Sequence, residues 1–217
     1  MSKIKAVLFD LDGTLTDSMP AHFESWNFAL KNYGLVINYT ELCLTEGADC
    51  YTIVDDIFRS KNIHSDKQTA EKLCEIKTAH YVKGSKPKLF DQVENILNFL
   101  QTKKIPIALV TGSSLENIRH SLSNNIFEKF QVIVKAGDTE KGKPYPDPYA
   151  KALEQLNLEP QDALVVENAP YGIKAAKAAG IKCAVVATTL DASYLSEADM
   201  IFENHCELLT FLEQNLQ

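Results

Sequence analysis

Short, continuous apolar runs recur along the chain and predict buried β-strands. They lie within the segments KAVLFD at 5–10, IPIALVTG at 105–112, FQVIVKAG at 130–137, ALVVEN at 163–168 and IKCAVVAT at 181–188. Continuous rather than alternating hydrophobicity is typical of strands that are covered on both faces, as in a parallel sheet. Most of the runs lead into a turn that carries Gly, Asp, Ser or Asn, and we expect the strands to end there.

Helical patterns alternate with these strands, at 92–104, 147–158, 169–180 and 205–217. Val93, Ile96, Leu97 and Leu100 show the spacing i, i+3, i+4, i+7 of one helix face. We expect Asp147 to cap the second helix and Gly180 to follow the third. The alternation of strand and helix predicts an α/β fold, a doubly wound, Rossmann-like parallel sheet with right-handed crossovers.

Residues 18–85 interrupt this rhythm, because they contain no convincing strand and several amphipathic helical patterns. Gly34 is predicted to end the first of these helices, and Ser65 with Gln68 is predicted to form a capping box for the last. The domains predicted from this change are an α/β core over 1–17 and 86–217 and a helical insert over 18–85.

Composition narrows the function classes. The net charge of −7 argues against a nucleic-acid-binding face, and the absence of a basic run argues against binding to an anionic membrane. The first apolar run is too short for a signal peptide, and no run is long enough to span a membrane. The five cysteines are scattered, odd in number and lack a C-x-x-C pair, so we expect reduced thiols and a cytoplasmic protein.

Polar side chains that suit phosphate chemistry follow the predicted strands. They are Asp10, Asp12, Thr111, Glu167 and Asn168, with Lys143 in a loop between two elements. Ligands of open α/β sheets bind beyond the carboxyl ends of the strands, so these groups are expected to converge. An unpaired buried carboxylate is costly, which makes a purely structural role for Asp10 and Asp12 unattractive. A nucleophile, an acid/base, a hydroxyl, a cation and metal ligands are the parts of a phosphoryl-transfer site.

Four motifs in order carry a resemblance to a known family. They are DLDGTL at 10–15, TGSS at 111–114, Lys143 within GKPYPDPY, and VVENAPYGI at 165–173. Together they resemble the haloacid dehalogenase superfamily of phosphohydrolases, over nearly the whole chain. The insert at 18–85 is similar to the small all-α cap of the branch that contains β-phosphoglucomutase, phosphoglycolate phosphatase and small sugar-phosphate phosphatases.

The resemblance implies a role for each motif. Asp10 would be the nucleophile that forms an aspartyl-phosphate, and Asp12 would be the general acid and base. Thr111 would donate a hydrogen bond to a phosphoryl oxygen, and Lys143 would neutralise the charge that develops there. The substrate-binding residues implied are Gly112, Ser113 and Ser114 in the core, and His22 and Lys77 in the cap.

A magnesium ion is the implied cofactor, because its preferred ligands are oxygen atoms. The resemblance assigns it to the Asp10 carboxylate, the Asp12 main-chain carbonyl, Asn168, and Glu167 through water. Asn168 departs from the acidic ligand that is usual in the family. Cys50 stands where mutase-like members carry an arginine, next to Asp49, and Ser114 stands where mutases often carry a lysine.

These features favour a Mg²⁺-dependent phosphohydrolase that cleaves a small phosphomonoester, a sugar or polyol phosphate. Two alternatives stay open: a β-phosphoglucomutase-like mutase, and a phosphate-binding protein that has lost turnover through Asn168. The expected partner is a small phosphorylated metabolite, with no nucleic acid and no membrane. No heptad seam or apolar interface run indicates an oligomer, and we expect a monomer.

Overall fold

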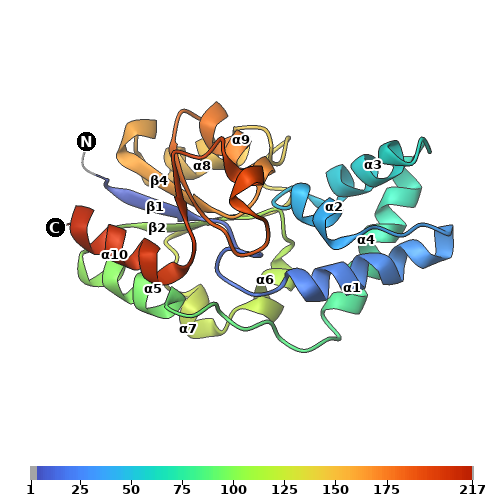
Figure 1. Cartoon of the computed structure of the whole chain (residues 1–217), viewed down its shortest axis with the longest axis horizontal. Coiled ribbons are helices and arrows are strands. Elements are labelled where there is room, and N and C mark those ends of the chain that lie inside the picture. The colour runs from blue at the N-terminus through green and yellow to red at the C-terminus, as the bar shows by residue number, and fades with distance from the viewer. Residues whose placement is uncertain (1–3, 217) are drawn as a thin grey trace.

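The computed structural model describes residues 4–216, and a six-stranded parallel sheet forms its centre (Figure 1). The strands, in the order in which they lie across the sheet, are β3 (Val132–Val134), β2 (Ile107–Val110), β1 (Ala6–Phe9), β4 (Ala163–Glu167), β5 (Lys182–Val186) and β6 (Met200–Phe202). The predicted α/β, doubly wound parallel sheet is therefore confirmed. The edge strand β6 was not predicted. Its apolar run is only three residues long, and these residues are exposed or half-buried.

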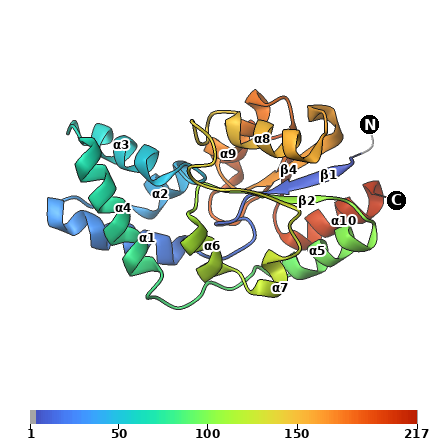
Figure 2. The ribbon, with the colours of Figure 1, turned by 180° about the vertical axis from the view of Figure 1, so that it is seen from behind.

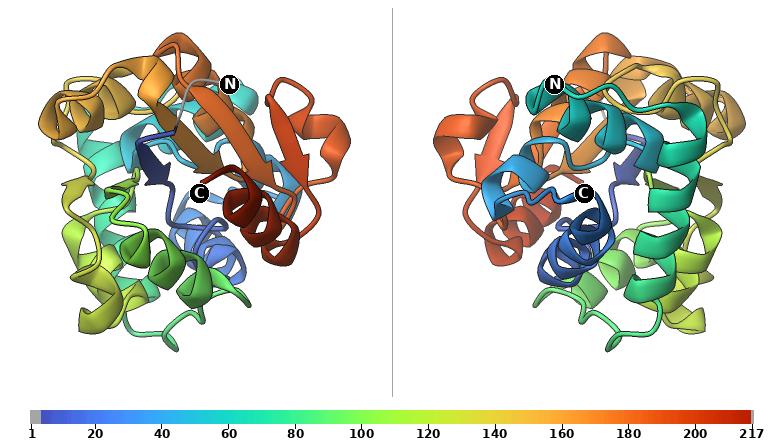
Figure 3. Two further views of the ribbon diagram at one scale, coloured as in Figure 1. Left: turned by 90° about the vertical axis from the view of Figure 1, so that its left-hand side faces the viewer. Right: turned by 90° about the vertical axis from the view of Figure 1, so that its right-hand side faces the viewer.

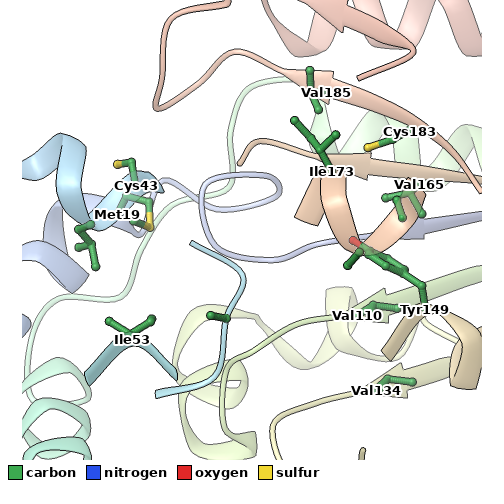
Figure 4. Packing of buried hydrophobic residues seen from close by; sticks show 14 of the residues in the cluster. Met19, Cys43, Ile53, Val110, Val134, Tyr149, Val165, Ile173, Cys183 and Val185 are labelled. Carbon is green, nitrogen blue, oxygen red and sulfur yellow. The ribbon is translucent and has the colours of Figure 1, made fainter. Parts of the chain in front are cut away.

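Helices cover both faces of the sheet (Figure 3). One face carries α8 (Asp147–Leu156) and α9 (Pro170–Ala178), and the other carries α5 (Val93–Thr102) and α10 (His205–Asn215). Successive strand residues point to opposite faces, so Leu8 packs with the first pair of helices and Val7 with the second. Figure 4 shows Tyr149 of α8 among the valines of neighbouring strands. The continuous apolar runs of the sequence reflect this two-sided burial.

Two short helices complete the α/β part, α6 (Leu115–Ser121) and α7 (Asn124–Phe127). Single 3₁₀ turns lie at Lys31–Tyr33, Pro160–Asp162 and Ala192–Leu195. The α8 helix begins at Asp147, with Pro146 in the N-cap position and no side-chain cap. The expectation that Asp147 is the N-cap is therefore wrong by one residue, because the helical backbone already includes it.

Four helices lie between β1 and α5: α1 (Met19–Leu30), α2 (Tyr39–Leu44), α3 (Cys50–Ser60) and α4 (Lys67–Tyr81). They project beyond the carboxyl ends of the strands, as the view from behind also shows (Figure 2). No strand occurs between residues 18 and 85, as the pattern predicts. The domain limits 1–17, 18–85 and 86–217 stay a prediction.

Of the two helix ends predicted in the insert, the structure agrees with the one at Gly34 and differs at the start of α4. Gly34 adopts φ of 64°, the left-handed region that glycine tolerates, and ends the 3₁₀ turn that follows α1. The N-cap of α4 is Asp66, whose carboxylate accepts a hydrogen bond from the Thr69 amide at 2.7 Å. The predicted capping box of Ser65 and Gln68 is therefore wrong, because Asp66 occupies the extended residue before the helix.

The insert contains a disulfide between Cys50 and Cys74, which joins the start of α3 to α4. The expectation of five reduced thiols is wrong at these two positions. Their separation of 24 residues gives no sequence signal, since the packing of α3 against α4 brings them together. Cys43, Cys183 and Cys206 are free thiols. Within residues 4–216, no helix is long and apolar enough to cross a membrane, and the cytoplasmic location stays a prediction.

Candidate active site

The loop after β1 places two carboxylates at the carboxyl end of the sheet. Asp10 is held by a hydrogen bond from its amide to the Val166 carbonyl of β4, at 3.0 Å. Gly13 then turns the chain with φ of 81°, and its amide donates to the Thr16 carbonyl at 2.8 Å. A β-carbon on Gly13 would lie 2.2 Å from the Asn168 amide nitrogen. Glycine is therefore required here both for the turn and for the close approach of the fourth motif.

Lys143 joins the first motif to the fourth. Its ammonium donates to Asp10 Oδ1 at 2.7 Å, Glu167 Oε1 at 2.7 Å and the Val110 carbonyl at 2.8 Å. The side chain is only 1% exposed. Burial acts to lower the pKa of Lys143, but the carboxylates of Asp10 and Glu167 raise it above its usual value. A lysine on the surface would have no such partners, so this one is part of the site.

Asp10 is buried with one oxygen unpaired. Oδ1 accepts from Lys143, whereas Oδ2 has no hydrogen-bond partner among the described residues. Burial raises the pKa of Asp10 well above its usual value against the opposing charge of Lys143, and Glu167 adds to the rise. A buried acceptor without a partner is costly, so Oδ2 is free to take a cation or to attack a substrate.

Asp12 lies in a different environment, in which hydrogen bonds stabilise its charged form. Ser113 donates to Oδ2 at 2.6 Å and Ser18 to Oδ1 at 2.7 Å, while His22 Nε2 lies 2.9 Å from Oδ1. Burial alone would raise the pKa of Asp12, but His22 and the two hydroxyls hold it well below its usual value. The two carboxylates of one motif therefore lie in environments that shift their pKa values in opposite directions.

The insert contributes two basic side chains. His22 on α1 stacks against Tyr81 on α4, with ring centroids 4.0 Å apart, and burial lowers its pKa. The Lys77 ammonium lies 5.7 Å from the Trp26 ring centroid and 5.3 Å from that of Tyr81. No ion pair or hydrogen bond to it occurs within residues 4–216, although Lys77 is only 7% exposed. Burial lowers the pKa of Lys77 to about 8.

The second motif lies against the insert. Thr111 Oγ1 accepts from the Ser113 amide at 3.0 Å, and Ser114 caps α6 by accepting from the Asn117 amide at 3.3 Å. Ser114 is therefore the N-cap of this helix. A β-carbon on Gly112 would lie 2.3 Å from the Ala48 carbonyl oxygen, so glycine is needed where the core meets the loop before α3.

A cavity of about 720 Å³ lies between the insert and the carboxyl ends of the strands. Several predicted residues line it, namely Asp12, His22, Lys77, Gly112, Ser113 and Ser114. Thr111 and Lys143 instead line a small neighbouring cavity of about 20 Å³, together with Gly112. Asp10, Glu167 and Asn168 are not among the lining residues of either. The described structure thus brings the charged groups together, with Asp10 behind the residues that line the cavity.

A profile described as "Haloacid dehalogenase-like hydrolase" matches residues 7–186. The chain belongs to this family.

Two relatives match this haloacid dehalogenase-like hydrolase over nearly its whole length. Validoxylamine A 7'-phosphate phosphatase of Streptomyces hygroscopicus subsp. limoneus is 32% identical over 207 residues, which cover 94% of this chain and 95% of that one. Hexitol phosphatase A of Escherichia coli is 29% identical over 217 residues, covering 98% and 96%. The structure of a Bacteroides vulgatus protein provisionally named a beta-phosphoglucomutase has a TM-score of 0.87 and 32% identity, covering 99% and 89%.

The site of this hydrolase fits a magnesium ion in the chemistry of its donors. Asp10 Oδ2 is a buried oxygen without a partner, and the Asn168 amide oxygen accepts only one hydrogen bond, from Thr14 at 2.9 Å. Within residues 4–216, no group of three or more His, Cys, Asp or Glu side chains is arranged to hold a metal by itself. A metal here would therefore depend on main-chain, amide and substrate oxygens as well.

Glu167 is engaged by protein donors on both oxygens. Lys143 and the Tyr149 hydroxyl donate to Oε1, each at 2.7 Å. The main-chain N–H of Asn168 donates to Oε2 at 3.1 Å. A β-carbon on Gly172 would lie 1.8 Å from Oε1, so this glycine makes room for the carboxylate. The role of Glu167 as a metal ligand through water stays a prediction, whereas its role as the anchor of Lys143 is visible.

Sequence reasoning missed two residues of the site. Tyr149 lies in the helical pattern at 147–158, and nothing in that pattern indicates a hydroxyl donor to Glu167. Glu46 lies in the loop before α3 and lines the large cavity. Burial raises the pKa of Glu46 well above its usual value, and the charges of Asp12 and Asp10 add to the rise. A lone glutamate next to Gly47 in an irregular segment has no sequence signature.

Proposed function

We propose that this haloacid dehalogenase-like hydrolase is a Mg²⁺-dependent phosphatase that acts on a small phosphomonoester through an aspartyl-phosphate on Asp10. The observation that supports it most is the contrast between the two carboxylates of the first motif. Asp10 has an unpaired oxygen next to the Lys143 ammonium, whereas both oxygens of Asp12 accept hydrogen bonds. This is the division of labour that a nucleophile and a proton carrier need.

In the first step, the Asp10 carboxylate attacks phosphorus, and the bond between phosphorus and the alcohol oxygen breaks. Asp12 gives that oxygen a proton. The low pKa of Asp12 in the free enzyme favours the carboxylate, and an approaching phosphoryl dianion shifts it toward the protonated form by like-charge repulsion. Lys143 neutralises charge on the phosphoryl oxygens, and Thr111 donates its hydroxyl hydrogen to one of them.

In the second step, water attacks the aspartyl-phosphate and loses a proton to Asp12, which releases phosphate and restores Asp10. Asp10, the Asp12 carbonyl and Asn168 would hold the magnesium ion, which supplies positive charge next to the phosphoryl group. Thr14 and Thr189 keep the Asn168 amide in one orientation, through hydrogen bonds of 2.9 and 3.0 Å. An amide oxygen contributes no formal charge, so metal binding in the free enzyme is expected to be weak and to strengthen when substrate phosphate arrives.

For the substrate we propose a sugar or polyol phosphate. The cavity of about 720 Å³ lies within the range of small-molecule sites, and it is lined by hydrogen-bonding groups, including Ser113, Ser114 and Lys77. Two relatives are named validoxylamine A 7'-phosphate phosphatase and hexitol phosphatase A. Release of phosphate from a panel of metabolite phosphates, with and without Mg²⁺, tests the proposal. No release above that of the Asp10→Asn protein would contradict it.

The mutase alternative finds less support at the far end of the cavity. A mutase must hold a second phosphate there, and Cys50 at the expected position carries no charge and is bonded to Cys74. Asp49 next to it is acidic. We therefore expect phosphate release from glucose 1-phosphate plus a trace of bisphosphate to exceed conversion to the 6-phosphate. Faster isomerisation than release would favour the mutase.

A further inference from the structure

Besides Asp12 and Glu46, the large cavity has a wall of acidic side chains. We call it the outer wall, and its members are Asp49, Glu71, Glu75, Glu116 and Glu140. They come from four different segments: the start of α3, α4, the start of α6 and the loop after β3. Among residues 4–216, no lysine or arginine other than Lys77 lines the cavity.

Lys77 does not neutralise the outer wall. Its ammonium lies against the rings of Trp26 and Tyr81, and its electrostatic neighbours are Asp12 and Glu46 at the inner end. Glu71 does have a basic neighbour, Lys67, with 3.8 Å between the Nζ and Oε1 atoms. Such solvent-exposed pairs contribute little.

Two charged side chains, one next to the wall and one in it, also have contacts of their own. Lys135 lines only the small neighbouring cavity, and its ammonium pairs with Asp138 at 2.7 Å. Asp49 also caps α3 by accepting from the Thr52 amide at 2.9 Å, which leaves its charge in place. The outer wall therefore keeps a net negative charge.

A buried amide in the same cavity indicates what kind of ligand belongs there. Asn117 on α6 lines the cavity and is 4% exposed, yet its Oδ1 atom has no hydrogen-bond partner among the described residues. The α4 and α6 helices meet where the Tyr81 hydroxyl lies 2.8 Å from the Ser121 hydroxyl. Lys77 and Asn117 each lie one helical turn before these residues. A buried acceptor is satisfied by a ligand that brings hydroxyl or ammonium hydrogens.

We propose that the outer wall and Asn117 select the non-phosphorylated end of the substrate, favouring an amine-bearing or hydroxyl-rich end and rejecting a second anionic group. This inference rests on the proposed phosphatase function and specifies its substrate class. Opposite charges a few ångströms apart across water attract by a factor of about five in affinity, and like charges repel by a similar factor. The outer wall acts on the far end of the ligand, away from the phosphoryl group that Lys143 and the metal attract.

The test compares three ligands that share a 6-phosphate and differ at the other end: glucosamine 6-phosphate, glucose 6-phosphate and 6-phosphogluconate. Binding is measured on the Asp10→Asn protein with Mg²⁺ by calorimetry, at low salt and at roughly 0.5 M salt. We expect affinity to decrease in that order, by about fivefold per step at low salt, and the differences to shrink at high salt. Equal affinities, or the reverse order, would overturn the inference.

Variants then locate the effect. The double change Glu71→Gln with Glu75→Gln is expected to reduce the amine preference, and Asn117→Ala is expected to weaken all three ligands to a similar degree. Glu213→Gln on α10, at the opposite end of the molecule from the insert, is the matched control and should change nothing (Figure 1). A preference that survives neutralisation of both glutamates would contradict the role of the wall.

The proposed function and this inference fail separately. Hydrolysis of p-nitrophenyl phosphate by the wild-type protein tests the phosphatase chemistry without any far end to select. No hydrolysis there would contradict the proposed function, while the binding order on the Asp10→Asn protein still decides the inference. Hydrolysis of p-nitrophenyl phosphate together with equal affinities for the three 6-phosphates would support the proposed function. The same result would show that the outer wall does not select the substrate.

Discussion

The two ends of the candidate site are built on different principles. At the strand ends, Asp10, Lys143 and Glu167 form a buried network in which charges of opposite sign meet at 2.7 Å. At the insert, the acidic outer wall is exposed or half-buried and is drawn from several helices. Buried charges tolerate no change of partner, whereas solvated charges can be exchanged at little cost. We therefore expect the inner end to determine the reaction and the outer end to determine the substrate.

The largest effect is expected from Asp10→Asn. The amide keeps the shape of the side chain but is no nucleophile, so phosphatase activity should fall by roughly a thousandfold or more. The fold should persist, because the amide fits the same space and Glu167 still accepts a hydrogen bond from Lys143 at 2.7 Å. Initial rates and thermal melts measure both. Asp17→Asn, an exposed acid in the same segment, is the control, and substantial residual activity in the Asp10→Asn protein would remove Asp10 from the reaction.

Removal of the lysine tests the buried network itself. Lys143→Met leaves Asp10 and Glu167 buried without their cation, and breaking such a pair costs about 3–5 kcal/mol of unfolding free energy. Activity should also fall, by roughly a hundredfold. Lys177→Met, which breaks an exposed ion pair with Asp199, should cost about 1 kcal/mol or less. Similar losses in urea melts of the two variants would contradict the contrast between buried and solvated charge.

These inner residues were predictable, and the reason is geometric. A strand end in a parallel sheet fixes where the next side chains point, so Asp10, Asp12, Thr111 and Asn168 could be placed from short motifs. Glu46, Asn117 and the disulfide could not, because their positions depend on how α3, α4 and α6 pack. The edge strand β6 was not predicted because it is short and only partly buried. The Asp66 cap was not predicted because the adjacent residues Ser65 and Asp66 are both suitable N-cap residues.

The disulfide provides a test of the insert alone. Closing a loop of about 24 residues stabilises the folded state by about 3 kcal/mol, mainly by constraining the unfolded chain. Reduction should therefore lower the melting temperature of the wild-type protein and leave that of Cys50→Ser with Cys74→Ser unchanged. Thiol titration of denatured protein should find three thiols before reduction and five after. Five thiols before reduction would contradict the pairing.

The smallest expected effect is a pH dependence of kcat/KM that arises from Lys77, which lies between the two ends of the site. Burial lowers the pKa of Lys77 to about 8, so its ammonium is lost as the pH rises through that value. If the ammonium binds substrate oxygens, kcat/KM should fall above pH 8, since this ratio reports the free enzyme. Lys77→Met should have a lower kcat/KM without this fall, and exposed Lys72→Met should behave as wild type. A fall that persists in Lys77→Met would assign it to another group.

We propose that the phosphoryl group is transferred to Asp10 and held there as a covalent intermediate. The most direct test is acid quenching of the wild-type protein during turnover of a reactive phosphomonoester with Mg²⁺, followed by peptide mass spectrometry. We predict one phosphorylated residue, Asp10, which appears before steady state and is absent from the Asp10→Asn protein. Phosphate release during turnover with no label on Asp10, or with label on another side chain, would contradict the account.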